Sequence, residues 1–517
     1  MATGRGWIYQ QHAKRSQKPE PIAQTRPPSL SSKTPAVKVQ HKSATIPVTT
    51  TVNKVPLLRK PMENKQLLMK TYIERLPCEI LLKIFSFLDP LSLMVVGSVN
   101  RRFYKLSKDN VLWHKIYISR QKVNQRWKSD SVKMLEKKLS DSVLDPDPGY
   151  WKKTYIKELM MTREKKMIQI MKSVKSFCSS EIPVSMKKAV RMSGLIWALT
   201  FVDVHESETM VEQTCLHFRE SSVTVTWNSY LWPEFHSLTK IRLHGITPVL
   251  TDNSLKPIKK GLRRLSLIAE YDLRNKKDFG RFIGQDMHIK LFHLHPGLIV
   301  GLWKKSPEIA FVMGTLHYHQ LLEKSFLGST ESPYIFPPHI PILDDIDPEY
   351  GLHGYQLHID MYSGSRTFLC RTFRGLFCRK EYIKNGHLRI AAIGLRNHKR
   401  HASLAGKVDF LWETLTLSGS IQNCFTMDVT VLDESEAPYW CFSAPVQLCE
   451  SKSLETCYDF MGQNFDLNYK DDMGRIHAEL IWMKEAEEYY VINLVLYLNT
   501  EKVNSYFGTN YTDSPVD

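Results

Sequence analysis

The sequence predicts an α+β protein with a disordered N-terminal tail, a small helical bundle, a helical linker and a large, mainly antiparallel β C-terminal domain. Three observations support this prediction. Residues 1–65 show little apolar periodicity, residues 72–118 repeat apolar side chains at helical spacing, and from about residue 220 the period changes to two. The expected boundaries are 1–65 for the tail, 72–118 for the bundle, 119–192 for the linker and 193–517 for the β-rich region.

The composition is that of a globular protein from a reducing compartment. Apolar residues make up 43% of the 517 residues, enough to bury a core. No run approaches the roughly 20 apolar residues that span a bilayer, and the N-terminus lacks the apolar stretch of a secretory signal. The nine cysteines include no C-x-x-C pair. We therefore expect an intracellular protein, cytoplasmic, nuclear or both, that has no membrane partner.

The net charge of +17 is unevenly distributed along the chain. The balance of basic over acidic residues is +10 in residues 1–65 and +14 in residues 101–192, whereas residues 193–517 carry −7. The basic tail and linker leave nucleic-acid binding open as an alternative function. The acidic balance of the β-rich region argues against a nucleic-acid-binding main domain, and a solvated helix face is the simpler account of a basic linker.

Residues 72–118 carry the start signals of four short helices. Pro77 begins the first at its initial helical position, Asp89 caps the second, and Asp109 caps the fourth. On a helical wheel the apolar residues of the first helix cover roughly 220°, about twice the width that a helix on its own core needs. The residues in this arc are Ile80, Leu81, Leu82, Ile84, Phe85, Phe87 and Leu88. The apolar surface beyond what this core needs must contact either the linker of the same chain or a partner protein.

The remaining segments follow from periodicity. Apolar residues at helical spacing predict helices on both sides of the break at Asp145–Gly149, and residues Glu308–Lys324 are expected to form a helix within the β-rich region. Asn385-Gly386 and Asp472-Met473-Gly474 are turn signals, and many strands with few helices predict an antiparallel sandwich or barrel-like domain. The expected strands are Ser222–Trp227, His288–His295, Gly354–Tyr362, His387–Ile393, Lys407–Trp412, Cys424–Leu432, Arg475–Met483 and Tyr490–Leu498.

Signs of catalysis or metal binding are weak. The sequence contains no phosphate-binding loop, dinucleotide fingerprint or nucleophile elbow. The pairs His293/His295 and His317/His319 would each share a strand face, but no neighbouring cysteine or carboxylate completes a ligand set. A thioester nucleophile at Cys370, Cys441 or Cys457 would need a lowered pKa and exposure. We therefore expect no catalytic residue, no metal and no cofactor.

The apolar spacing over residues 76–113 resembles the F-box. The match includes Leu76-Pro77, Ile84-Phe85, Gly97 and Leu112-Trp113, and departures such as Cys78 fall at variable positions. The resemblance implies docking to a Skp-family adaptor, which a cullin scaffold holds together with a RING subunit. The protein would then be the non-catalytic substrate-recognition subunit of an SCF-type (Skp adaptor, cullin, F-box) E3 ubiquitin ligase. An unknown protein substrate would bind through residues 193–517.

By the same resemblance, eleven residues are expected to form or support the adaptor-binding site. Leu76 and Pro77 would start the docking loop, and Leu112 and Trp113 would close the bundle. The full set is Leu76, Pro77, Ile80, Leu81, Ile84, Phe85, Leu88, Leu93, Val99, Leu112 and Trp113. Segments His295–Trp303, Glu349–Tyr355 and Asn493–Leu498 extend the resemblance to one member of this family over most of the chain beyond the tail.

Overall fold

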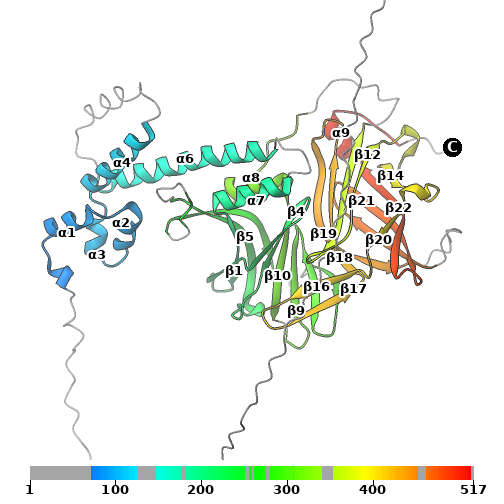
Figure 1. Cartoon of the computed structure of the whole chain (residues 1–517), viewed down its shortest axis with the longest axis horizontal. Helices are drawn as coiled ribbons and strands as arrows, with labels where there is room; N and C mark the ends of the chain where they lie inside the picture. Colours follow the sequence, from blue (N-terminus) through cyan, green and yellow to red (C-terminus); the bar gives the residue numbers. More distant parts are fainter. Residues whose placement is uncertain are drawn as a thin grey trace, which may run out of the picture. The chain divides into compact units, whose positions relative to one another are not determined.

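The computed structural model describes residues 72–125, 147–175, 182–250, 256–258, 261–274, 280–306, 308–340, 353–451 and 462–513. The expected tail, residues 1–65, lies outside them, as do residues 126–146 and 176–181 of the expected linker. Within the described residues, the helical segment comes first and the strands follow (Figure 1). This order confirms the predicted α+β class. None of the described helices combines the length and apolar character needed to cross a bilayer.

The N-terminal helices begin where their capping residues predict. A short 3₁₀ helix, η2 (Tyr72–Arg75), is followed by α1 (Cys78–Phe85), α2 (Pro90–Val96), α3 (Arg101–Leu106) and α4 (Asn110–Gln125). Asp89 Oδ1 accepts a hydrogen bond from Ser92 N, and Asp109 Oδ1 accepts one from Leu112 N, both at 3.1 Å. Pro77 occupies the N-cap of α1 instead of its first helical position, because its ψ of 154° is extended.

The helix α6 (Tyr150–Lys175) takes part in two hydrophobic cores. Near its beginning, Tyr155 and Leu159 are buried in the core of the N-terminal helices. Further along, Met167 and Met171 are buried in a core built by strands and by α7 (Ile182–Ser193). The apolar residues that predicted helical structure in the linker are therefore divided between two cores.

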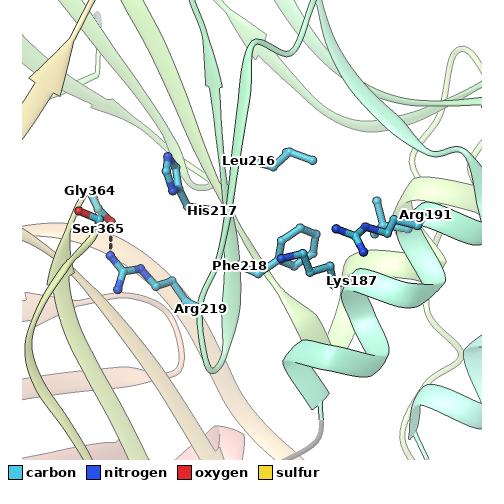
Figure 2. A pocket seen from close by; sticks show the side chains of 9 residues that line it. Lys187, Arg191, Leu216, His217, Phe218, Arg219, Gly364 and Ser365 are labelled. Carbon is cyan, nitrogen blue, oxygen red and sulfur yellow. Dashed lines mark hydrogen bonds between the residues drawn. The ribbon is translucent and has the colours of Figure 1, made fainter. Parts of the chain in front are cut away.

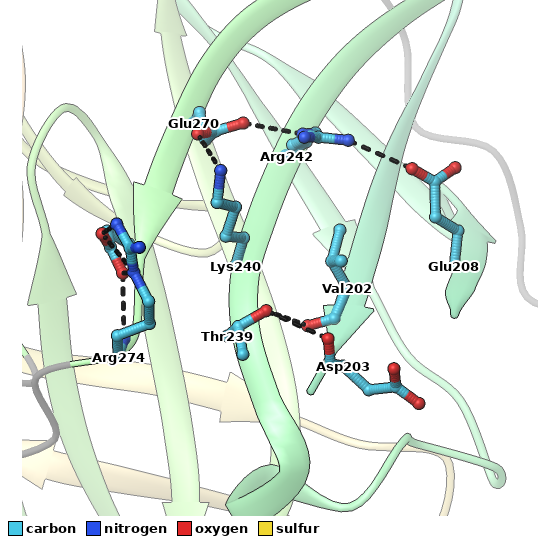
Figure 3. A network of polar contacts seen from close by, with 9 residues as sticks. Val202, Asp203, Glu208, Thr239, Lys240, Arg242, Glu270 and Arg274 are labelled. Carbon is cyan, nitrogen blue, oxygen red and sulfur yellow. Dashed lines mark hydrogen bonds and ion pairs between the residues drawn. The ribbon is translucent and has the colours of Figure 1, made fainter. Parts of the chain in front are cut away.

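The first sheet has four strands in the order β2-β1-β5-β6, and charged side chains line one of its faces. Its strands are β1 (Ile196–Asp203), β2 (Glu208–Glu212), β5 (Leu238–Pro248) and β6 (Arg263–Asp272). Glu270 pairs with Lys240 at 3.0 Å and with Arg242 at 2.7 Å, and Arg242 also pairs with Glu208 at 3.1 Å (Figure 3). The hydrogen bond from Arg242 lowers the pKa of the Glu270 carboxyl. Because such exposed pairs contribute about 0–1 kcal/mol each, the packed opposite face accounts for more of the stability.

The second sheet has six strands in the order β3-β4-β10-β9-β8-β7 and packs with the helix α8. Its elements are β3 (Cys215–Phe218), β4 (Ser222–Trp227), β7 (Arg281–Gln285), β8 (Ile289–Leu294), β9 (Leu298–Trp303), β10 (Ile309–His317) and α8 (Tyr318–Leu327). Leu321 and Phe326 of α8 are buried with Trp197 and Leu243 of the first sheet. These contacts place the two sheets and α8 around one core.

The third sheet has ten strands in the order β12-β11-β18-β19-β20-β21-β22-β14-β13, with β15 also paired to β22. Its strands are β11 (Tyr355–Ser363), β12 (Arg366–Leu376), β13 (Ile383–Lys384), β14 (His387–Ile393), β15 (Ala402–Leu404), β18 (Cys424–Leu432), β19 (Pro438–Glu450), β20 (Gln463–Lys470), β21 (Gly474–Met483) and β22 (Glu488–Asn499). A separate hairpin, β16 (Asp409–Glu413) and β17 (Ser418–Gln422), and the helix α9 (Thr500–Phe507) complete this part of the chain. Short 3₁₀ helices lie at Phe235–Ser237, Lys380–Tyr382 and His398–Arg400. The strand pairs of the described residues are antiparallel, as predicted.

The eight expected strands are present, with ends that differ by at most two residues. Asn385 and Gly386 have φ values of 53° and 69°, the conformation of a tight hairpin turn, and they join β13 to β14. The expected helix over Glu308–Lys324 is wrong in its first half, which is the strand β10. Residues Ile309–Thr315 are buried throughout, so the strand has no polar face and its sequence cannot be told from that of a buried helix.

A buried polar seam joins the second and third sheets. The alternation in β18 predicts Asp428 on a polar face, and that face is buried: Asp428 is 0% exposed. Its carboxylate accepts hydrogen bonds from Ser222 Oγ of β4 and from Tyr362 OH of β11, the latter at 3.1 Å. Close by, His317 Nε2 lies 2.8 Å from Thr430 Oγ1. Burial raises the pKa of Asp428 to about 6, although the hydrogen bonds and Arg219 oppose this shift.

We expect Asp428→Asn to change how stability depends on pH. The folded-state pKa of Asp428 lies about two units above that of the unfolded chain, so the stabilisation by the neutral acid is complete below about pH 4. It is lost as the pH rises through 6. The unfolding free energy of the wild type relative to the Asn variant should therefore fall by about 2 kcal/mol between pH 4.5 and 7.5. Denaturant unfolding at both pH values measures this difference, and a difference independent of pH would contradict the assignment.

Candidate functional site

The helices α1 to α4 enclose a small core built from five of the eleven predicted site residues. Leu81, Phe85, Leu93, Leu112 and Trp113 are all buried. Phe85 meets Phe103 edge to face with ring centroids 5.5 Å apart, and Trp113 Nε1 donates to Ser107 O at 2.6 Å. A Cβ added at Gly97 would lie 2.4 Å from Ser107 Oγ, so this glycine permits the close approach of α2 to the end of α3.

The segment before α1 is held in place by α3. Arg102 donates to the carbonyl oxygens of Glu74 and Leu76 at 2.5 and 2.6 Å. Asn100 caps α3 by accepting a hydrogen bond from Phe103 N at 2.8 Å, and its amide nitrogen donates to Glu74 Oε1 at 3.1 Å. These bonds fix the chain at Leu76, so the exposed Pro77 that follows has a defined position.

A second set of apolar residues faces away from this core. Ile80 is 48% exposed and Ile84 37%, both on α1, and Phe87 just after it is 78% exposed. Val95 of α2 and Val99 beyond it are also exposed. We call Ile80, Ile84, Phe87, Val95 and Val99 the apolar face. Isolated exposed apolar residues need no explanation. The bundle, however, exposes eight large apolar side chains, and the five of the apolar face all lie on α1, on α2 or just after these two helices, which indicates an interaction surface.

Other parts of the chain cover the bundle elsewhere. Trp113 packs against Tyr155 of α6 with ring centroids 5.4 Å apart. Val249 and Leu250, which follow β5, belong to the same core. The surplus apolar surface predicted from the sequence is therefore divided: one part meets the linker and the chain after β5, and the apolar face is left exposed.

The eleven predicted site residues thus fall into three groups. Five are buried in the bundle, Leu76 and Leu88 are partly buried, and Pro77, Ile80, Ile84 and Val99 are exposed. Phe87 and Val95 are exposed residues absent from the predicted set. Phe87 lies in the apolar arc of the helical wheel, and this position could have identified it as a site residue.

Lysines near α3 perturb two neighbouring groups. The Lys108 ammonium lies 3.8 Å from the centre of the Tyr104 ring, and its hydrogen bond and charge lower the pKa of Tyr104. Burial lowers the pKa of Lys152, and the charge of Lys108 adds to that effect. Two lysine side chains, Lys108 and Lys152, therefore lie near Tyr104.

The cysteines considered as nucleophiles show no sign of activation. Burial raises the pKa of both Cys370 and Cys441 to about 12, the reverse of what a reactive thiolate requires. Cys457 lies outside the described residues. The histidine pairs also differ from the expected arrangement, because His295 lies beyond the end of β8 and His319 lies in α8. His317 Nε2 is already paired with Thr430 Oγ1.

The F-box-like family model matches residues 73–119, which span α1 to α3, the larger part of α4 and the short segment before α1. The fold of this segment and the match together define the chain as an F-box protein. F-box only protein 15 of Homo sapiens is 45% identical over 442 residues, covering 85% of this chain and 86% of that protein. The chain belongs to the F-box only protein 15 family.

Two further relatives carry the same name. The protein of Macaca fascicularis is 46% identical and that of Mus musculus 37% identical, each over 438 residues that cover 84% of this chain and 100% of the relative. Among solved structures, that of MucB in complex with MucA(peri) covers 61% of this chain at 10% identity with a TM-score of 0.10. This last similarity is too low to support any conclusion.

The division between core and apolar face can be tested with two adjacent residues. Leu81→Ala should destabilise the bundle by about 2–5 kcal/mol, because it leaves a cavity in a packed core. Ile80→Ala should cost less than about 1 kcal/mol, because half of this side chain is already exposed. Hydrogen exchange of the amides of α1 to α4 reports both effects. Equal losses in the two variants would show that Ile80 belongs to the core.

Proposed function

We propose that this F-box protein is the substrate-recognition subunit of an SCF-type E3 ubiquitin ligase, working inside the cell. The apolar face carries the proposal, since the bundle still exposes Ile80, Ile84 and Phe87 although its core is completed by α6 and by the chain after β5. Membership of the F-box only protein 15 family supports the same role. In this role the protein binds a Skp-family adaptor, and through it a cullin and a RING subunit.

The exposed and buried residues have different tasks in this proposal. The exposed side chains of Pro77, Ile80, Ile84 and Val99 insert between helices of the adaptor, where loss of water contact provides most of the binding free energy. The buried residues, with Leu81 and Trp113 at the centre, keep α1 and α2 in the geometry that presents the face. Fixing Leu76 to α3 in advance reduces the entropy lost on docking.

The β-rich region, residues 193–517, binds the target in this proposal, and ubiquitin transfer takes place on other subunits. The contribution of this chain to the reaction is proximity. Holding the target beside the ubiquitin-loaded enzyme converts an encounter between separate molecules into a step within one complex, which raises the effective concentration. No residue of this chain needs to contact the reacting bond.

Adaptor binding should depend on the apolar face. In the full-length chain, Ile80→Ser with Ile84→Ser should weaken binding to the Skp-family adaptor at least about 10-fold, because truncating central apolar anchors costs more than 1 kcal/mol each. Leu76→Ala with Pro77→Ala should act in the same direction and leave the β-rich region folded. Co-purification with adaptor and cullin, followed by a titration of purified adaptor, measures the change.

Leu231→Ser is the matched control, because Leu231 is an equally apolar side chain that is 84% exposed but lies in the β-rich region. It should bind the adaptor like the wild type. Adaptor binding that survives both double substitutions would contradict the proposal. The alternative function, nucleic-acid binding by the basic tail and linker, would then be tested. It predicts an affinity for DNA or RNA that falls steeply as the salt concentration rises.

A further inference from the structure

A cluster of metal-binding side chains lies where the second and third sheets meet. Glu220 in the β3–β4 turn, His358 of β11 and Cys370 of β12 each offer one donor atom, and these atoms lie within 4.8 Å of one another. In the part of the chain that the structure describes, this is the one group of three His, Cys, Asp or Glu residues at such spacing. The sequence predicts no metal, because Glu220 lies far from the other two along the chain.

Strand register brings most of the cluster to one face of the β11–β12 hairpin. His358 and Asp360 are two residues apart on β11 and so share a face. Asp360 lies directly opposite Cys370, and His358 opposite Thr372. Cys370 Sγ is 4.0 Å from His358 Nε2, and a tetrahedral zinc ion would hold such a pair about 3.5 Å apart. A side-chain movement of about half an ångström closes this gap.

A neighbouring hydroxyl orients the imidazole for metal binding. His358 Nδ1 lies 2.8 Å from Thr372 Oγ1. With the Nδ1 proton donated to this hydroxyl, Nε2 keeps its lone pair on the side that faces Cys370. Metal-binding histidines are commonly held by such a bond from the other ring nitrogen, which fixes both the tautomer and the ring position.

A buried carboxyl oxygen beside the cluster lacks a hydrogen-bond partner. Asp360 is 1% exposed, and its Oδ1 accepts no hydrogen bond from the described residues. With Glu220 and Cys370, it lines a cavity of about 390 Å³. Of the charged groups that act on Asp360, Asp428 and Glu220 are negative and Arg219 is positive. A divalent cation in this cavity would give the Asp360 carboxyl the partner that it lacks.

The turn that carries Glu220 is fixed through its neighbour Arg219. One terminal nitrogen of Arg219 donates to Thr367 Oγ1 at 2.9 Å. The other donates to Gly364 O, a contact shown in Figure 2, which views a neighbouring pocket that Arg219 and Gly364 also line. The guanidinium carbon lies 4.4 Å from the centre of the Tyr362 ring. These contacts hold the β3–β4 turn against the β11–β12 hairpin, so Glu220 is in place before an ion binds.

We propose that Glu220, His358 and Cys370, with Asp360 beside them, form a zinc site that clamps the β3–β4 turn to the β11–β12 hairpin. A thiolate and an imidazole disfavour magnesium and calcium, which prefer oxygen ligands, and the mixed set of sulfur, nitrogen and oxygen donors fits zinc. As the Zn–S bond forms, the Cys370 thiol releases its proton to solvent. The site is separate from the apolar face and does not depend on adaptor binding.

The test uses the full-length chain, reconstituted with zinc chloride under reducing conditions and freed of excess metal. Plasma mass spectrometry should find about one zinc per chain. With Co²⁺ in place of zinc, an absorption band from thiolate-to-cobalt charge transfer should appear. Cys370→Ser should remove this band and weaken zinc binding at least about 100-fold, and Thr372→Val should weaken it about 10- to 100-fold through the orientation of His358.

Cys449→Ser is the matched control, since Cys449 is an exposed thiol on β19 outside the cluster. It should keep both the bound zinc and the cobalt band. Circular dichroism of each variant checks that the sheets are intact. A wild-type chain that retains no zinc, a cobalt band that persists in Cys370→Ser, or a band that disappears in Cys449→Ser would each overturn the proposal.

Discussion

The arrangement of the β-rich region depends on the burial of one carboxylate. Asp428 lies at the contact between the second and third sheets, and its hydrogen bonds reach Ser222 in one and Tyr362 in the other. A buried carboxylate is tolerated when these partners are present and is costly when they are absent. Apolar contacts would allow the sheets to meet in several positions, whereas these bonds are directional and favour one. The Arg219 contacts and the cluster around Cys370 lie along the same seam.

The helical bundle follows a different constraint, its small size. A segment of this length cannot bury all of its apolar side chains within itself. The structure resolves this by adding Tyr155 and Leu159 of α6, and Val249 and Leu250 after β5, to one side of the bundle. The apolar face is not covered by any other part of the described chain. The proposed binding surface therefore consists of the apolar residues that the rest of the chain leaves exposed, and it does not depend on any single residue.

Local patterns account for what could be predicted from the sequence. The helix starts at Asp89 and Asp109 and the turn at Asn385-Gly386 follow from nearby residues, and strands with clear alternation were found close to their true ends. The strands β1 and β10 were missed or misassigned, because both are buried on two faces and lack alternation. The prediction of eleven site residues did not separate the exposed ones from the buried ones, since one helical arc contains both.

Long-range register accounts for what could not be predicted. Cys370 was weighed as a nucleophile and two histidine pairs were weighed as ligands, each from spacing within one segment. The cluster that the fold assembles instead joins Glu220 to His358 and Cys370 across a sheet contact. His358 and Cys370 become neighbours through strand pairing, and Glu220 joins them through the contact between two sheets. Apolar periodicity encodes neither arrangement.

Because α6 is shared by two cores, it restricts which changes of sequence this chain can tolerate. Its residues Leu159 and Met167 are buried in two different cores, and the stretch between them is continuous helix. Each residue of an α-helix turns the chain by about 100° and advances it by about 1.5 Å. Inserting or deleting one residue in this stretch would rotate one buried stripe away from its core, whereas exchanging one exposed side chain for another would not. Among relatives, the length of this stretch should therefore be far more restricted than its composition.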